Sequence, residues 1–191
     1  MSCLNKLTSN ITYDCTTGTR AKGGLEGKAV IINKADIDLQ ALTQSGSTVT
    51  NLSLNAGESG YDISWVKQLG SASSTFAVND GLDSFTHAFL CRVFGSSAED
   101  AERIKELSEG EFVVVVETKY KGEDNADAFK VYGLENGLKM SEATMNSTEN
   151  DNSMLFTLSS LEGFGEQYPY LVFLETDYST SKAKFDDKFS S

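Results

Sequence analysis

The chain has 191 residues, a formal net charge of -12 and a hydrophobic content of 39 %. This length is sufficient for one sizeable core, and this hydrophobic content argues against disorder throughout. No apolar run approaches the length of a membrane span, and the N-terminus lacks the apolar region of a secretory signal. We therefore expect one domain, made in the cytoplasm, with no membrane segment.

The negative charge lies mainly in the second half of the chain. Residues 1–95 contain eight Asp and Glu against seven Lys and Arg, whereas residues 96–191 contain twenty against nine. Binding to the phosphates of DNA needs concentrated basic residues, so the composition argues against a protein that grips nucleic acid. It is compatible with a solvated acidic surface, or with a surface past which DNA slides without sticking.

The three cysteines are Cys3, Cys15 and Cys91. An odd number of cysteines without a secretory signal predicts reduced thiols, with a Cys3–Cys15 bridge as the less favoured alternative. Cys91 lies in an apolar strand pattern and is expected to be a small buried residue. The sequence does not assign a role to Cys3 or Cys15.

The first half of the chain predicts an arm followed by strands. Residues 1–27 are polar and glycine-rich and are interpreted as an N-terminal arm or loop. The glycines at its end resemble a phosphate loop only superficially, because the Lys-Ser/Thr that should follow is missing. Alternating apolar residues and turn signals then predict strands at 28–33, 48–55, 61–69, 75–80 and 82–94.

A single helix is predicted at about 97–109. Ser96 and Ser97 are N-cap candidates, and Ser96 with Glu99 fits a capping box. Gly110 is the expected residue just past the C-terminus. The helix should lie on a sheet through one apolar stripe, which comprises Ala98, Ala101, Ile104 and Leu107.

The second half again reads as strands. The segment 111–120 is apolar on both faces at its centre, so we expect it to be covered on both sides. Asn136-Gly137 is a strong hairpin signal between strands at 128–134 and 138–145. Further strands are predicted at 153–161 and 170–176, followed by a polar tail with Phe185 and Phe189 as isolated anchors.

These elements predict a mainly β fold. Eight to ten strands with short connections and one helix indicate an antiparallel β-sandwich or partly closed barrel, flanked by one α-helix at about 97–109. The expected organisation is an N-terminal arm (1–27), a single β-rich domain (28–176) and a polar C-terminal tail (177–191).

Residue chemistry does not indicate an enzyme. His87 is the single histidine and lies within a strand, where packing or hydrogen bonding is a commoner role than catalysis. The spacing of cysteines and histidine fits no metal site, and no nucleophile elbow occurs. Trp65 and the tyrosines at 132, 168 and 170 could line a sugar or lipid pocket, but core packing is the favoured interpretation. We therefore predict no catalytic, cofactor-binding or metal-binding residues.

The order of features resembles one known family. The sequence carries "KQLGSASSTFAVND", then "SSAEDAERIKELSEGEFVVVVE", then "FKVYGLENGLKMSEATMN" and "NDNSMLFTLSSLEG". This layout, over residues 25 to 175, resembles the tail tube protein of tailed bacteriophages, of the kind found in phages of gut Bacteroidetes. Its distinctive parts are the capped helix before the valine strand, the "YGLENGL" hairpin, and the Thr/Leu strand that ends at "LEG".

The resemblance implies a virion structural protein of the phage tail. Copies would form stacked, six-membered rings, with strands of each copy joined into an inner barrel and an acidic lumen through which DNA passes without specific binding. The partners would be further copies, the tail terminator, the tape measure protein and the baseplate. The loops 34–48 and 67–74 and the two termini are the expected contacts between rings. The polar faces of 111–120 and 126–134 are the expected lumen.

Two other interpretations stay open. One is another virion ring protein, such as a tail terminator, connector or capsid decoration protein, which would stop at one ring. The other is a β-barrel module that binds a glycan or small ligand near Trp65 and remains a monomer.

Overall fold

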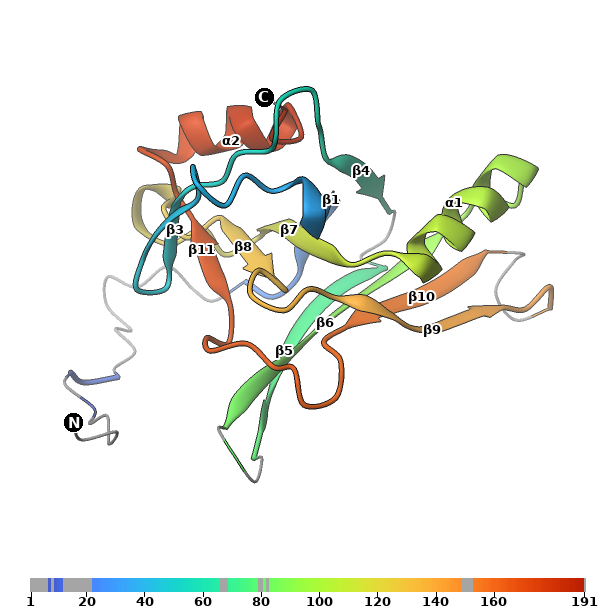
Figure 1. Ribbon diagram of the computed structural model, residues 1–191, viewed down its shortest axis with the longest axis horizontal. Helices are drawn as coiled ribbons and strands as arrows, with labels where there is room; N and C mark the ends of the chain where they lie inside the picture. The colour runs from blue at the N-terminus through green and yellow to red at the C-terminus, as the bar shows by residue number, and fades with distance from the viewer. Residues whose placement is uncertain are drawn as a thin grey trace.

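The computed structural model describes residues 7, 9–11, 22–65, 69–78, 81, 83–148 and 153–190. The protein is mainly β, with two sheets, helix α1 beside them and a C-terminal helix α2 (Figure 1). This confirms the predicted fold class. The described strands do not close into a barrel, so the arrangement is a sandwich of two open sheets.

The large sheet has seven strands. The interior strand β7 (Phe112–Thr118) carries Val113 to Val116, each with no exposed surface, which confirms that this strand is covered on both faces. Two of these valines belong to each of the two cores that flank the sheet. In spatial order the strands are β2 (Thr43–Ser45), β3 (Thr48–Asn51), β11 (Leu171–Phe173), β8 (Phe129–Tyr132), β7 (Phe112–Thr118), β1 (Leu25–Asn33) and β4 (Tyr61–Ser64).

The small sheet has four strands, each antiparallel to its neighbours. In spatial order they are β5 (Gly70–Ala77), β6 (Ser84–Val93), β10 (Met154–Ser159) and β9 (Lys139–Met145). The hairpin pairings of β5 with β6 and of β9 with β10 confirm the order predicted from the sequence. Both hairpin turns lie largely outside the described residues.

The two cores lie on opposite faces of the large sheet. The inner core fills the space between the sheets and contains Trp65, Phe89 and Phe156. The outer core lies under α2 (Tyr178–Asp186), which covers the far face of the large sheet (Figure 1). Phe185 and Phe189 are 0 % and 2 % exposed. This confirms the two phenylalanines as the anchors of the C-terminal segment, but the segment forms a docked helix that the sequence did not predict.

Helix α1 (Ala98–Glu109) forms where it was predicted, with different ends. Ser97 and Asp100 form the capping box, one residue later than Ser96 and Glu99. Gly110 has φ -93°, so it does not adopt the left-handed conformation expected after a helix. It is needed because a Cβ there would meet the ring of Phe112.

The prediction of a β-hairpin at Asn136-Gly137 is also wrong. Strand β8 pairs with β7 and β11 in the large sheet, whereas β9 pairs with β10 in the small sheet. The turn therefore carries the chain from one sheet to the other. Gly133 and Gly137 have φ of +77° and +78°, so both need the left-handed region that glycine enters readily. The dipeptide marked a tight turn but not the partners of the strands beside it.

The chain contains three further departures from the sequence prediction. Strand β1 begins at Leu25, three residues before the predicted start at 28, within the segment assigned to the arm. Strand β2 was not predicted. Two short 3-10 turns, Lys34–Asp36 and Glu123–Asn125, lie in connections. Most of the predicted N-terminal arm lies outside the described residues.

Candidate functional site

One face of the small sheet is covered and the other is bare. Phe89 and Phe156 are fully buried against the large sheet, and the strand register places alternate residues on the opposite face. We call that opposite face the hydroxyl face. It carries mainly small hydroxyl side chains, namely Ser71, Ser73, Thr75, Thr86, Thr144, Thr157 and Ser159, together with Ala88, Leu90, Arg92, Lys139, Glu142 and Leu155.

The small sheet also ends in a free, unprotected edge at β5. No described strand pairs with the outer side of this strand. Its eight residues, "GSASSTFA", include no charged residue and no proline. Edge strands of monomeric proteins are usually short or carry charges, because a long uncharged edge is a template for pairing with another chain. The edge strand β9, at the other side of the sheet, carries Lys139 and Glu142.

The hydrogen bonds of β6 identify which backbone groups of β5 are free. The N–H of Phe85 donates to Glu166 O at 2.9 Å, and the Glu166 N–H donates to Phe85 O at 2.8 Å. In an antiparallel strand, alternate residues direct both backbone groups to opposite sides. Ser73, opposite Ala88, therefore bonds to β6, whereas Ala72, Ser74 and Phe76 direct their N–H and C=O groups to the free edge.

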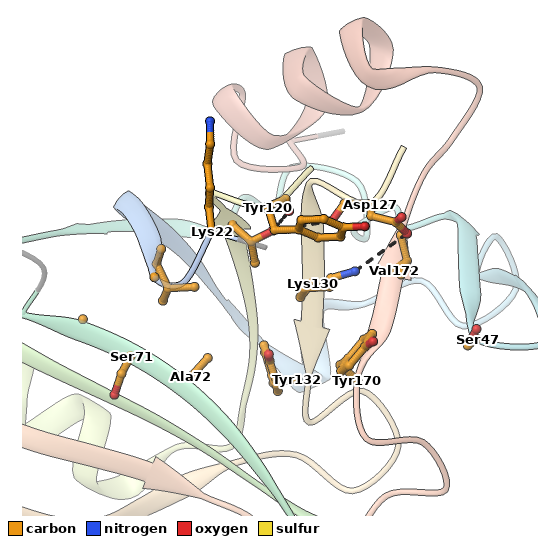
Figure 2. A pocket seen from close by; sticks show the side chains of 14 residues that line it. Lys22, Ser47, Ser71, Ala72, Tyr120, Asp127, Lys130, Tyr132, Tyr170 and Val172 are labelled. Carbon is orange, nitrogen blue, oxygen red and sulfur yellow. Dashed lines mark hydrogen bonds and ion pairs between the residues drawn. The ribbon is translucent and has the colours of Figure 1, made fainter. Parts of the chain in front are cut away.

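A groove of about 690 Å³, which we call the lysine–tyrosine groove, lies beside this edge (Figure 2). It runs between the start of β5 and the part of the large sheet formed by β8 and β11. Tyr120, Tyr132 and Tyr170 contribute to its walls. Figure 2 shows Lys130 reaching toward Asp127, and their Nζ and Oδ1 atoms are 3.8 Å apart. The Lys130 Nζ is also 4.7 Å from the centre of the Tyr170 ring. Burial lowers the pKa of Lys130.

Trp65 packs in the core, which confirms the favoured interpretation over the alternative of a pocket at this residue. Trp65 is 6 % exposed and packs against Phe89 with ring centres 5.9 Å apart, so it belongs to the inner core. Tyr168 does not line the lysine–tyrosine groove, whereas Tyr132 and Tyr170 do. Burial raises the pKa of Tyr132 to about 12, so its hydroxyl stays protonated. A second groove, of about 810 Å³, separates α1 from β4.

His87 has a structural position between the sheets. It is 1 % exposed, and its Nδ1 accepts a hydrogen bond from the Gly133 N–H at 3.1 Å. Because Nδ1 is an acceptor, the proton is on Nε2, which donates to Tyr168 O at 2.9 Å. Burial lowers the pKa of His87 and keeps the ring neutral. Both ring nitrogens are satisfied within the fold, as expected for a packed histidine.

Glu166 binds the turn that follows Gly133, whose N–H is bonded to His87. It is 2 % exposed, and its carboxylate accepts hydrogen bonds from the backbone N–H groups of Glu135 at 2.9 Å and Asn136 at 3.0 Å. The Asn136 side chain donates to Gly165 O at 2.7 Å. The "YGLENG" segment is thus a fixed connection between the two sheets. The Glu166 carboxylate is used to hold this connection by hydrogen bonds to its backbone.

Glu117 fixes the C-terminal helix. Its carboxylate accepts hydrogen bonds from Lys121 Nζ at 2.6 Å and Tyr178 Oη at 2.8 Å, and Lys182 Nζ lies 3.3 Å away. Burial opposes the charged form, but these donors and cations outweigh it and lower the pKa of Glu117. The sequence analysis missed Glu117, Glu166 and Lys130. The available signal was a charged residue inside or beside an apolar strand, which for Glu117 is the end of "FVVVVE".

Of the three cysteines, the structure describes Cys91. Burial raises the pKa of the Cys91 thiol to about 12, so it stays protonated and unreactive. Cys3 and Cys15 lie outside the described residues. Within the described ranges, no cluster of three metal-ligating side chains occurs and no helix is long and apolar enough to span a membrane.

The expected lumen and ring contacts need correction. Strand β7 is buried on both faces from Phe112 to Glu117, and β8 from Phe129 to Tyr132 exposes little surface, so neither has a polar face free for a channel. In the segment 67–74, which was expected to be a loop, the residues from Gly70 onward belong to β5. The segment 34–48 contains a 3-10 turn and β2, and its Leu39 is 77 % exposed. Its role between rings stays a prediction.

Comparison of the chain with protein-family models, curated proteins and solved structures finds no match. The function is therefore argued from the geometry of the small sheet and its surroundings.

Proposed function

We propose that the chain is a subunit of the tail tube of a tailed bacteriophage, where copies form rings, expected to contain six subunits, that stack into a tube. The observation that carries this proposal is the small sheet, which has a bare hydroxyl face and an unprotected edge at β5. The resemblance of the sequence layout to tail tube proteins supports it.

The strand directions suit closure into a ring. Strands β5, β6, β10 and β9 are successively antiparallel, so the two edge strands run in opposite directions. Copies related by rotation can therefore join β5 of one to β9 of the next and keep the antiparallel alternation around the whole ring. The two strands have eight and seven residues, so their lengths match.

Joining the edges removes an aggregation hazard and adds hydrogen bonds. The free N–H and C=O groups of Ala72, Ser74 and Phe76 would make about six bonds to β9 of the next copy. At about 1 kcal/mol each, these contribute roughly 6 kcal/mol before the entropy cost of association. A closed barrel leaves no edge strand exposed.

The hydroxyl face would line the channel. Its charged side chains are Arg92, Lys139 and Glu142, whereas seven of the twenty Asp and Glu residues of the second half lie on α1 and on the turn Glu123–Asn125. In this proposal the lining is therefore close to neutral, in place of the acidic lumen that the resemblance implied. A face without clustered Lys and Arg does not retain DNA phosphates, so DNA can pass without specific binding. The partners remain the tail terminator, tape measure and baseplate, and the location is the virion.

The test is a substitution that blocks the edge of β5. In Ser74→Pro the ring of proline replaces the free N–H, and the bonds of β5 to β6 are kept. Ser74→Ala is the matched control, since the Ser74 hydroxyl is buried and makes no hydrogen bond in the described structure.

Purified protein would be followed by sedimentation velocity and negative-stain imaging over a concentration series. We expect the wild type and Ser74→Ala to form rings or tubes with a central channel and Ser74→Pro to remain folded and monomeric. Single rings that never stack would favour a terminator or connector. A wild type that stays monomeric at every concentration would overturn the proposal, as would tubes of Ser74→Pro.

A further inference from the structure

The lysine–tyrosine groove contains an ammonium that lacks a strong partner. The Lys130 side chain is 11 % exposed, yet its closest carboxylate oxygen is 3.8 Å away and belongs to Asp127, which is 46 % exposed. No hydrogen-bond acceptor contacts Nζ within the described part of the chain. A charged group that has lost water without gaining an acceptor is costly, so the groove is suited to an anionic partner. Lys22 adds a second positive charge at its rim.

The position of the groove identifies which part of a second copy can reach it. The groove lies along Gly70 to Ala72 of β5, on the face of the small sheet that the large sheet covers. At the opposite edge of the small sheet, α1 packs on β9 and covers the same face, with Ile104 and Leu107 beside Met140. When β5 of one copy pairs with β9 of the next, α1 of that next copy lies immediately beyond the edge of β5. Adjacent strands are about 4.8 Å apart and a helix is about 10 Å wide, so this helix reaches the groove.

Helix α1 carries the complementary charge. Arg103 pairs with Glu99 and Lys105 pairs with Glu109, whereas Glu102 and Glu106 make no ion pair within 4 Å in the described structure. Glu106 is close enough to Arg103 to help raise its pKa, so it shares this cation with Glu99. Glu102 and Glu106 are four residues apart, so they lie on the same side of the helix and repel one another. These two carboxylates are therefore available to pair with cations on the surface of another copy. The exposed Ala98 and Ala101 leave room for a close approach.

We propose that the lysine–tyrosine groove binds the acidic face of helix α1 from a second copy of this chain, with Lys130 and Lys22 facing Glu102 and Glu106. This inference rests on the proposed ring. It adds a second contact between neighbouring copies, beside the pairing of β5 with β9. The contact is electrostatic, so assembly weakens as salt is raised from about 50 to 500 mM, where the screening length falls from roughly 14 to 4 Å.

The test uses charge substitutions in full-length protein. Lys130→Met removes the charge with little change in volume and should raise the protein concentration needed for assembly about tenfold. Lys130→Glu should raise it further. Lys28→Met removes a charge outside the groove and outside the segments expected between rings, and it should assemble as the wild type does. Thermal unfolding of each variant checks that the monomer is folded.

A mixing experiment gives the decisive result. The double variant Glu102→Lys with Glu106→Lys should assemble poorly alone, and an equimolar mixture with Lys130→Glu should recover assembly because the charges are exchanged across the contact. Folded Lys130→Met and Lys130→Glu that assemble at the wild-type concentration would overturn this inference and leave the tube proposal intact. Failure of the mixture to recover assembly would also overturn it. A wild type that never assembles would overturn both.

Discussion

Replacing Phe185 with alanine tests whether the C-terminal segment is part of the core. The Phe185 ring is fully buried, with its centre 5.0 Å from that of Phe129, and Lys28 and Lys182 lie over it at 5.0 and 5.2 Å. Truncating a fully buried phenylalanine to alanine typically costs 3–5 kcal/mol, and we expect about 4 kcal/mol here. For a chain of this length that corresponds to a fall in Tm of about 8–16 °C.

The assay is urea unfolding at pH 7, with thermal unfolding as a second measure. Phe76→Ala is the matched control, because Phe76 is 55 % exposed and its loss should cost less than about 1 kcal/mol. A free energy of unfolding that falls by under about 1 kcal/mol in Phe185→Ala would refute the docking of α2. The segment 177–191 would then behave as the polar tail that the sequence suggested.

Two further predictions concern pH. Because burial lowers the pKa of His87 from its ordinary 6.5, the unfolded chain binds a proton there that the folded chain does not bind. The free energy of unfolding should therefore be highest above pH 6.5 and fall as the pH drops below it. His87→Gln should flatten this slope between about pH 5.5 and 7.5 in urea titrations. Glu117→Gln should lower the free energy of unfolding by about 2–3 kcal/mol at pH 7, because Lys121 and Lys182 lose a buried carboxylate. Since the pKa of Glu117 is lowered from 4.5, its contribution is fully present above that pH and is lost as the pH falls through the lowered pKa of the folded state. The difference between variant and wild type should therefore shrink steadily as the pH is taken below 4.5, and a difference that stays constant down to acid unfolding would contradict this assignment.

The sequence was sufficient wherever the structure depends on a local pattern. The capping residues and apolar stripe of α1 gave the position of the helix to within a residue, because helix ends depend on nearby side chains. The valines of β7 indicated burial on both faces because an apolar residue at every position leaves no polar side. The alternation around His87 correctly predicted a packed histidine on the covered face of β6.

The sequence was not sufficient where partners are distant. Asn136-Gly137 specifies left-handed backbone for a tight turn, and the same dihedral angles serve a hairpin or a step between sheets. The choice was made by β11, which occupies the edge of β8 that β9 would need. The tail was misjudged because its apolar residues are few, and only the tertiary structure brings Phe185 and Phe189 together over the large sheet.

The candidate assembly surface shows the same division. By itself the sequence determined most of the strands and helix α1, since these follow from residue type and spacing. Only the tertiary structure decided that β5 and β9 are the edges of one sheet, that its hydroxyl face is bare, and that Lys130 lies in a groove beside the free edge. Strand order depends on which surfaces bury each other across the whole fold, and no local pattern in the chain encodes that competition.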